Sequence, residues 1–327
     1  MSMRMGLVPV PLKSPEGDWV EAMRAGDFER AWSISDRDLA ALCRTGPAKH
    51  VGPRHLQRIW RGEELCGKRV LVRCYHGLGD TIQFLRFMPA LRRIAREVTV
   101  WCQPELLCLV ERVEGVDRAL PLNDGTPEVA FDADIEIMEI PHAIKATRDT
   151  VEMQHPYLSL PPVEADVLPE HAGALAVGVV WEVGDWDKRR AIPAALLRML
   201  GGEGIDLYSL QRGPASRQLG EFGAKDFSTS DICQLGQRIR RLDLVICVDT
   251  MVAHLAGALG IEAWVLLHAG CDWRWPASGD RSFWYPSLRL FHQGMPGGWA
   301  GVVEEVRIAL CERARGRYPS AAPTGGG

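Results

Sequence analysis

Apolar residues at the start of the chain recur with the spacing of amphipathic helices. Within residues 19–61, Trp19 and Met23 stand one helical turn apart and begin such a face. Asp36 is placed to cap a second helix, because its short carboxylate can accept hydrogen bonds from the first free N–H groups. Two helices are too few for a repeat array, which needs roughly three or more stacked units. We therefore expect residues 1–65 to form a short N-terminal helical appendage packed on the first domain.

After this segment the pattern changes to short apolar strands that alternate with helices. A Gly-rich turn at residues 76–80 follows the first strand, and apolar positions at helical spacing predict a helix over residues 81–96. Pro104 starts the next helix at a position that proline tolerates. The alternation predicts a doubly wound α/β domain, which we place at residues 66–160. Its expected strands are residues 70–72, 98–101, 119–120 and 133–137.

A proline-rich segment at residues 155–170 separates this series from a second one and is interpreted as a linker. We place the second Rossmann-like domain at residues 161–314 and expect a disordered tail over residues 315–327. Whether its last helix, residues 302–314, packs back on the first domain stays open. Two such domains joined by a hinge imply a cleft between them. The expected strands of the second series are residues 175–181, 205–210, 244–248 and 264–267, with a helix over residues 251–259.

Composition and charge limit the class of protein. Apolar residues make up 46% of the 327 residues, and no stretch approaches the roughly 20 apolar residues of a transmembrane helix. The formal net charge is −4 without a basic tract, so we expect no nucleic-acid partner. The nine cysteines lack metal-ligand spacing and are expected to be free thiols in a reducing compartment. We therefore expect a cytoplasmic protein without a transmembrane segment, and peripheral contact with the inner face of the membrane stays open.

The Gly-rich turn after the first strand is the first candidate site. Ligands of open parallel sheets bind at the carboxyl ends of the strands, so residues 76–81 are expected to face a crevice. Gly77 and Gly79 let the backbone approach a ligand closely. Asp80 either caps the helix or accepts a proton from a bound hydroxyl, and its position alone favours the cap. The motif lacks the third glycine and the acidic residue of a dinucleotide-binding fingerprint.

The second candidate site lies where a hydrophobic strand turns into a helix at Asp249 and Thr250. The free N–H groups in the first turn of a helix form a ready site for a phosphate. His254 lies in the first turns of this helix and is placed to bind a diphosphate oxygen. A structural hydrogen bond is the alternative for that histidine and, from its position alone, the more common one.

A polar loop at residues 182–190 is the third candidate site. It follows another strand, so it is expected to reach the same cleft. Its Lys188, Arg189 and Arg190 are suited to neutralise a leaving diphosphate, as a divalent metal does in other enzymes. A solvated surface loop is the alternative interpretation.

Two further patterns are less specific. Asp-x-Asp matches occur at residues 132–134 and 185–187, but one lies along a strand and the other stands beside three cations, so we expect no metal. Trp273 and Trp275 follow the helix predicted over residues 251–259. Tryptophan faces stack on sugar rings, yet packing in a core or between domains is their more common use.

These loops, in this order, carry a resemblance to a known family. The chain resembles glycosyltransferase family 9, the ADP-heptose:lipopolysaccharide heptosyltransferase-like group with a GT-B fold, and within it the bacterial branch often fused to tetratricopeptide repeats. The VDTMVAHLAGALG and DWRW segments are specific, whereas GLGD alone is not. The matching segments are GLGDTIQFLRFMPAL (77–91), QPELLCLV (103–110), VGVVWEVG (177–184), DKRRAIP (187–193), SLQRG (209–213), LDLVICVDTMVAHLAGALG (242–260), CDWRW (271–275) and FWYPSLRLFHQ (283–293).

The resemblance implies an inverting, metal-independent transferase without a cofactor. It would move a sugar from a nucleotide-diphosphate sugar, with an ADP-sugar favoured, to a hydroxyl of a glycan, a lipid-linked glycan or a protein. Asp80 takes the role of the base in this family. The implied donor-site residues are Lys188, Arg189, Arg190, Gln211, Asp249, Thr250, Met251, Ala253 and His254. His76, Gly77, Gly79 and Gln83 are expected to position the acceptor or its loop, and Asp272, Trp273 and Trp275 are a candidate sugar wall.

Three positions depart from the family pattern. Ala191 stands where Ser is expected, Phe283 stands where Pro is usual, and residues 228–230 lack an expected Asp-Thr pair. The last departure leaves nucleotide contacts around Asp231 undecided. Two other functions therefore stay open: a GT-B-type nucleotide-sugar epimerase, and a non-catalytic sugar-nucleotide-binding or scaffold protein.

Overall fold

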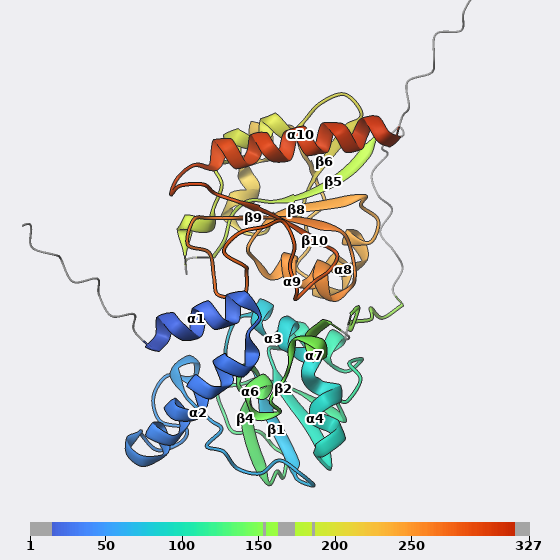
Figure 1. Cartoon of the computed structure of the whole chain (residues 1–327). Coiled ribbons are helices and arrows are strands. Elements are labelled where there is room, and N and C mark those ends of the chain that lie inside the picture. The colour runs from blue at the N-terminus through green and yellow to red at the C-terminus, as the bar shows by residue number, and fades with distance from the viewer. Residues whose placement is uncertain (1–14, 153–154, 163–173, 185–186, 318–327) are drawn as a thin grey trace, which may run out of the picture.

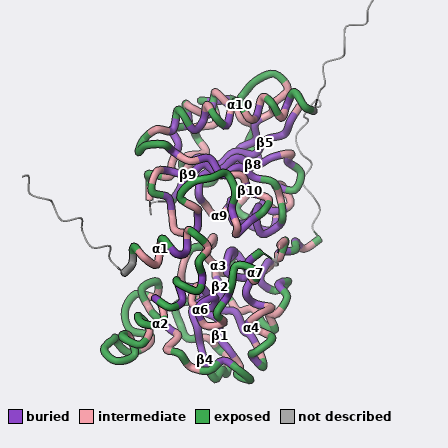
Figure 2. The backbone as a smooth tube through the Cα atoms, viewed as in Figure 1, coloured by how far each residue is buried: buried purple, intermediate pink, exposed green. Residues whose placement is uncertain are grey.

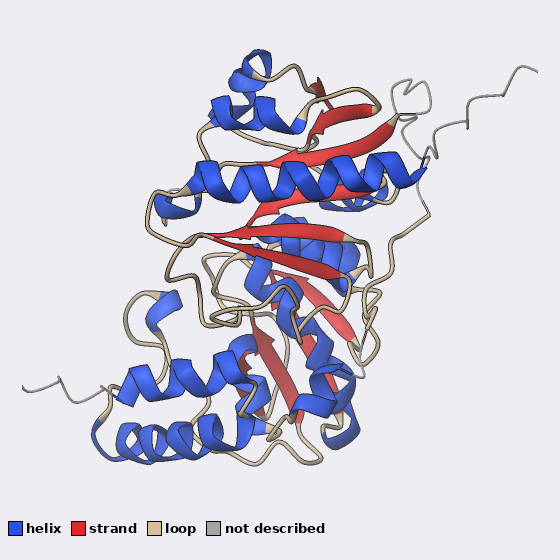
Figure 3. Ribbon diagram, turned by 45° about the horizontal axis from the view of Figure 1, so that its top comes forward, coloured by secondary structure: helices blue, strands red, loops and turns tan. Residues whose placement is uncertain are grey.

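Two parallel β-sheets, one above the other, form the framework of the molecule (Figure 1). The computed structural model describes residues 15–152, 155–162, 174–184 and 187–317. Helices lie on the faces of both sheets, and the strands between them are mostly buried (Figures 2 and 3). This arrangement follows from the sequence, because strands covered on both faces read as continuous apolar runs rather than as an alternation.

The first sheet has four parallel strands in the order β3-β2-β1-β4. Its central strand β1 pairs Val70 with Val98 of β2 on one side and with Ala133 of β4 on the other. The strands are β1 (Arg69–Arg73), β2 (Glu97–Cys102), β3 (Arg118–Pro121) and β4 (Ala133–Glu136). The helices of this half are α3 (Leu78–Phe84), α4 (Met88–Ile94), α5 (Leu107–Val110), α6 (Ile140–Ala143) and α7 (Arg148–Glu152).

The second sheet has six parallel strands in the order β10-β9-β8-β5-β6-β7. Its two faces belong to two separate apolar clusters, one of which is continuous with the core of the first sheet. The strands are β5 (Leu175–Val180), β6 (Ile205–Ser209), β7 (Lys225–Asp226), β8 (Leu244–Val248), β9 (Ala263–Leu267) and β10 (Leu288–His292). The helices are α8 (Ile232–Ile239), α9 (Met251–Ala258) and α10 (Trp299–Arg317).

The predicted strands are all present, and the doubly wound α/β fold is confirmed. The sequence pattern does not predict β7, which has only two residues, or β10. No helix separates β9 from β10 in this described stretch, so the strand–helix alternation that predicts the other strands fails there. Part of the predicted linker, residues 163–170, lies outside the described residues.

Several predicted helix boundaries are wrong. The second N-terminal helix begins at Phe28 and is capped by Asp27, whose carboxylate accepts from Arg30 N. Asp36 instead lies inside that helix and forms an ion pair with Lys145. The helix predicted over residues 81–96 begins at Leu78 and is divided by a 3₁₀ turn.

The last helix belongs to the second half of the molecule. Residues Val302, Val303, Val306 and Leu310 of α10 are buried in the apolar cluster on one face of the second sheet. The helix therefore does not pack back on the first domain. It also continues through Arg317, past the predicted start of the tail, and residues 318–327 lie outside the described residues.

The N-terminal helices α1 (Pro15–Ala25) and α2 (Phe28–Thr45) pack on the first domain, as expected. Trp32 Nε1 donates a 2.7 Å hydrogen bond to the carbonyl of Ala146. The helices also contact the second half, because the ring of Phe28 meets that of Trp284 edge-on at 5.7 Å between centroids. The appendage thus contacts both domains.

A disulfide joins the two halves of the molecule. Cys108 on α5 is bonded to Cys233 on α8, 125 positions away in the sequence. The prediction that all nine cysteines are free thiols is therefore wrong for these two. The sequence offers no signal for the pair, because neither residue lies near another cysteine at a recognisable spacing.

No helix among the described residues is both long and apolar enough to cross a membrane.

Candidate active site

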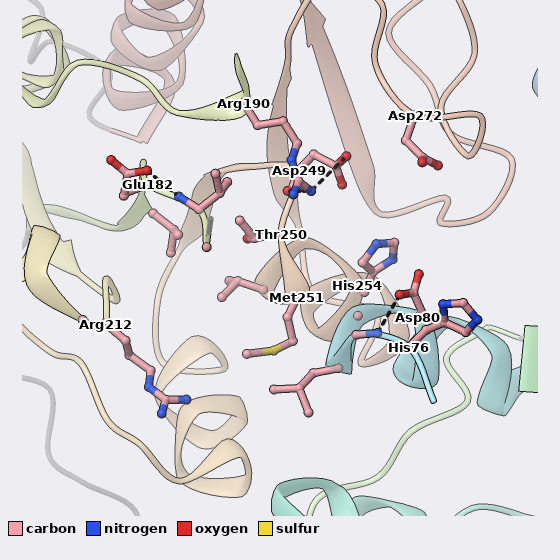
Figure 4. Close-up of a pocket in the computed structure, with 18 of the residues that line it drawn as sticks. His76, Asp80, Glu182, Arg190, Arg212, Asp249, Thr250, Met251, His254 and Asp272 are labelled. Carbon is pink, nitrogen blue, oxygen red and sulfur yellow. Dashed lines mark hydrogen bonds and ion pairs between the residues drawn. The ribbon is translucent and has the colours of Figure 1, made fainter. Parts of the chain in front are cut away.

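A large cavity lies between the two sheets, at the carboxyl ends of their strands. Its volume is about 1440 Å³, and both halves of the chain line it. The loops after β1, β5, β6 and β8 all reach it, as expected for ligand sites of open parallel sheets. Helices α3 and α9 meet at one side of the cavity and bring the first and second candidate sites together (Figure 4).

Gly79 is required by the close approach of these helices. A Cβ atom at this position would lie 2.8 Å from Cδ2 of His254 and 3.4 Å from Cα of Met251. A residue with a side chain at this position would therefore force His254 or the start of α9 to shift.

Asp80 is held by both of its carboxylate oxygens. Oδ2 accepts a 2.9 Å hydrogen bond from the backbone N–H of Gly77, which precedes the first turn of α3. Oδ1 accepts from Nη2 of Arg274 at 2.5 Å, an interaction that crosses between the domains. Asp80 stands within the first turn, three residues after the capping position, so it satisfies a backbone donor at the helix start and also lines the cavity. The capping and catalytic interpretations are thus compatible in one geometry.

Arg274 is a buried cation at the centre of the site. Besides Asp80, it donates to Oε1 of Gln83 at 2.6 Å and to Oδ1 of Asp272 at 2.8 Å. Its guanidinium lies 4.3 Å from the centroid of the Trp273 ring. Burial by itself lowers the pKa of Arg274, but the neighbouring carboxylates of Asp80 and Asp272 outweigh this effect and raise it.

Burial shifts the pKa values of two side chains at the Gly-rich turn, Glu136 and His76, toward the uncharged form. Burial raises the pKa of Glu136 to about 8, although its carboxylate accepts hydrogen bonds from the N–H groups of Met138 and Tyr75. Burial also lowers the pKa of His76, whose Nε2 lies 3.8 Å from Glu136. Desolvation thus favours the neutral form of both side chains near neutral pH.

The second candidate site comes from the second domain and adjoins the first site where α9 meets α3. Thr250 caps α9 with extended backbone, and the amino end of this helix faces the cavity (Figure 4). Asp249 is buried, which raises the pKa of its carboxyl. Arg190 Nη1 donates a 2.9 Å hydrogen bond to the carbonyl oxygen of Asp249. The basic loop and the helix start therefore form one cationic wall, because helix N-termini also carry partial positive charge.

His254 has the structural hydrogen bond that its position suggested, and it also lines the cavity. Its Nδ1 lies 2.9 Å from the hydroxyl of Tyr285, and its ring stacks on that of Trp275. Burial holds the pKa of His254 well below its usual range, so the imidazole is neutral.

The three adjacent cations of the basic loop point in different directions. Lys188 and Arg190 line the cavity. Arg189 points outward, with its side chain 74% exposed, and is paired with Asp187 at 2.8 Å. The three side chains point in different directions because they lie on a short 3₁₀ turn, which places successive side chains around its axis.

The carboxylates of the Asp-x-Asp matches are engaged by arginines where the structure describes them. Asp132 pairs with Arg69 and Asp134 with Arg73, each at 2.7 Å. Asp187 pairs with Arg189, and residues 185–186 lie outside the described residues. Within the described ranges, no group of three or more His, Cys, Asp or Glu side chains is arranged to hold a metal ion.

Most of the predicted site residues meet in this cavity. Those that line it are His76, Gly77, Gly79, Asp80, Lys188, Arg190, Gln211, Asp249, Thr250, Met251, His254 and Asp272. Five others do not: Arg189, Gln83, Ala253, Trp273 and Trp275. Gln83 and Ala253 are buried beneath the surface of the cavity, Trp275 is fully buried, and Trp273 packs against Trp19 and Phe84. The two tryptophans therefore serve packing in this structure.

The cavity also has lining residues that the sequence does not indicate. Arg274 lies inside the DWRW segment, so the motif itself was the available signal. Glu182 and Arg212 likewise lie inside segments that the sequence singled out, the polar loop at 182–190 and SLQRG at 209–213. The others come from segments without a recognisable pattern and reach the site through the tertiary structure. They include His55, Leu56, Tyr75 and Met138 from the first half and Gln218 from the second.

Comparison with known sequences yields one distant relative. No model of a known protein family matches the chain. Protein FlbA of Caulobacter vibrioides is 23% identical over 288 residues, which cover 77% of this chain and 48% of FlbA. The chain thus spans about half the length of the curated relative that it matches.

Solved structures share the fold. The family 9 glycosyltransferase of Veillonella parvula DSM 2008 superposes with a TM-score of 0.51 at 14% identity, covering 79% of this chain and 99% of that protein. The ADP-heptose LPS heptosyltransferase II of E. coli superposes with a TM-score of 0.50 at 13% identity, covering 75% of this chain and 99% of that protein. The predicted GT-B architecture, two Rossmann-like domains facing a cleft, is thereby confirmed.

Proposed function

We propose that this protein is a glycosyltransferase that moves a sugar from a nucleotide-diphosphate sugar to a hydroxyl acceptor. One observation carries the proposal: a carboxylate and a cationic helix start face the same cavity from opposite domains. Asp80 comes from the first domain, and Arg190 and the amino end of α9 come from the second. An acceptor and a donor bound on the two walls would bring their reacting atoms together, which is the main requirement of a group transfer.

The second domain is proposed to hold the donor. Lys188, Arg190 and the start of α9 supply the positive charge that a diphosphate needs. Gln211 and Arg212 extend this wall and offer polar contacts to the rest of the nucleotide. An ADP-sugar is the proposed donor, since the sequence resembles the ADP-heptose transferases and the E. coli protein of similar fold is named for ADP-heptose.

The proposed reaction is a single displacement with inversion at the anomeric carbon. The acceptor hydroxyl transfers its proton to Asp80 while its oxygen bonds to the anomeric carbon, and the bond to the diphosphate breaks. The electron pair of that bond leaves with the diphosphate, whose growing charge Lys188 and Arg190 stabilise. These two side chains are proposed to replace the divalent metal of other sugar transferases.

A ligand screen followed by a transfer assay tests this function. The melting temperature of the full chain would be measured with ADP-, GDP-, UDP- and dTDP-sugars, because a ligand that binds the native state raises it. Release of nucleoside diphosphate would then be followed with and without glycan, lipid-linked glycan and peptide acceptors. Acceptor-dependent release is the expected result. Epimerised sugar or free nucleotide formed without an acceptor would indicate an epimerase, and donor binding without any turnover would indicate a binding protein.

Replacing Arg190 by methionine should weaken donor binding by about 10- to 100-fold. The estimate corresponds to the loss of one charge-assisted hydrogen bond in a partly buried site. Isothermal titration with the donor found in the screen measures this change. Arg189→Met is the matched control, because the neighbouring cation points away from the cavity, and its donor affinity should stay within about two-fold of the unchanged protein. Equal losses in both variants would contradict the assignment of Arg190.

A further inference from the structure

The strongest unassigned feature of the site is the buried arginine that links its two domains. Arg274 lies on the segment that follows β9, yet two of its three carboxylate or amide acceptors, Asp80 and Gln83, belong to α3 of the first domain. Its third acceptor is Asp272 of its own segment. The side chain is only 8% exposed. The planar guanidinium group of Arg274 is therefore fixed by three oxygen atoms that come from both domains.

The segment that carries Arg274 is held from behind by the N-terminal helices. Nη2 of Arg24 on α1 donates to the carbonyl oxygen of Cys271, the third residue before Arg274. The ring of Trp19 on the same helix meets the ring of Trp273 edge-on, with centroids 5.1 Å apart. Cys271 and Trp273, which both precede Arg274 in this segment, are therefore in contact with α1, whose described residues do not line the cavity.

We propose that Arg274 is the positioning residue for Asp80, and that the N-terminal helices set its place. The inference rests on the proposed transferase function. Arg274 holds Oδ1 while the N–H of Gly77 holds Oδ2, so the carboxylate cannot rotate and its remaining lone pairs keep one direction. A general base works only when it lies within hydrogen-bond reach of the proton that it takes, so this fixed direction matters for the rate.

Arg274 also links proton transfer to the departure of the diphosphate. When the proton of the acceptor hydroxyl reaches Asp80, the carboxylate becomes neutral and its ion pair with the guanidinium weakens. The positive charge of Arg274 is then less compensated while the diphosphate gains the electron pair of the broken bond. Arg274 and Asp249 line the same cavity, so this charge lies in one site with the proposed donor wall. A charge already in place where negative charge develops stabilises a transition state without reorganisation.

The test compares Arg274→Met and Arg274→Lys with the unchanged protein in the transfer assay. The methionine variant should lose about 10- to 100-fold in kcat, with donor KM changed by less than about three-fold. The lysine variant keeps the charge but not the planar fork, so it should recover only part of the lost kcat. A methionine variant with unchanged kcat, or a lysine variant that recovers none of the lost kcat, overturns the proposal. If the methionine variant does not fold, kcat of the lysine variant and of the α1 variants decides.

Variants of α1 test the second half of the proposal. Trp19 and Arg24 lie outside the cavity and contact the segment that carries Arg274. Trp19→Ala and Arg24→Met should therefore lower kcat about three- to ten-fold, because they loosen that segment. Donor binding should stay unchanged, because neither variant touches the donor wall. Arg30→Met is the matched control, because this exposed residue of α2 pairs only weakly with Asp18 and Glu21. Folded α1 variants with unchanged kcat overturn the role of the helices. Absence of transfer by the unchanged protein overturns the proposed function and this inference together, whereas transfer that is insensitive to Arg274 overturns the inference alone.

Discussion

Replacing Asp80 by asparagine is expected to lower kcat by about 10²- to 10⁴-fold, the usual contribution of a general base. Asparagine has nearly the same shape, and its amide oxygen can still accept the hydrogen bond from Gly77 that begins α3. The helix start is therefore kept while the proton acceptor is lost. Donor affinity should stay within about three-fold, because the proposed donor wall belongs to the other domain.

Steady-state kinetics at saturating donor and acceptor, together with calorimetric donor binding, measure this effect. Asp124→Asn is the control, since Asp124 is exposed on the β3–β4 connection and lies outside the cavity. The control should have the kcat of the unchanged protein. An Asp80→Asn variant with the same kcat would remove Asp80 from the mechanism and leave it as a helix-capping residue only.

Replacing Cys108 by serine should lower the free energy of unfolding by about 2–4 kcal/mol under oxidising conditions. The disulfide to Cys233 closes a loop of 125 positions, and long loops lose the most conformational entropy in the unfolded state when they are crosslinked. The bond also connects α5 of the first domain with α8 of the second. Its loss should therefore make separation of the domains easier as well.

Thermal unfolding with and without a reductant measures this contribution. The unchanged protein should melt at a lower temperature when reduced, and Cys108→Ser should melt near that lower temperature in both conditions. Cys66→Ser, which removes an exposed free thiol, is the control and should keep the difference between the two conditions. A reductant effect that persists in Cys108→Ser would show that the Cys108–Cys233 bond is not its source.

The two domains and their strands follow from local patterns. Runs such as residues 244–248 are apolar at every position, because both faces of the strand are covered, and such runs are visible in a sequence without any knowledge of its fold. The sequence pattern did not predict strand β10, because no helix precedes it. The prediction that Asp36 caps a helix was wrong, because α2 continues through this residue. Local signals thus predict which segments become buried elements better than they predict where each element begins and ends.

The loops of the site were also predictable, since the carboxyl ends of parallel strands meet along one edge of a sheet. The directions in which the side chains of those loops point could not be predicted from the sequence. Arg189 and Arg190 are adjacent in the sequence, yet one points to solvent and the other to the cavity. Trp273 and Trp275 likewise looked suited to a sugar wall but are used for packing.

The sequence by itself determined the two-domain α/β class, the strands that build it and the loops that carry the candidate chemistry. Only the tertiary structure decided which distant groups meet: Arg274 with Asp80, 194 positions apart, and Cys108 with Cys233, 125 positions apart. The physical reason is that periodicity records which face of a segment avoids water, a local property of the chain. The partner of a side chain depends on how whole elements pack against one another, and no short segment contains that information.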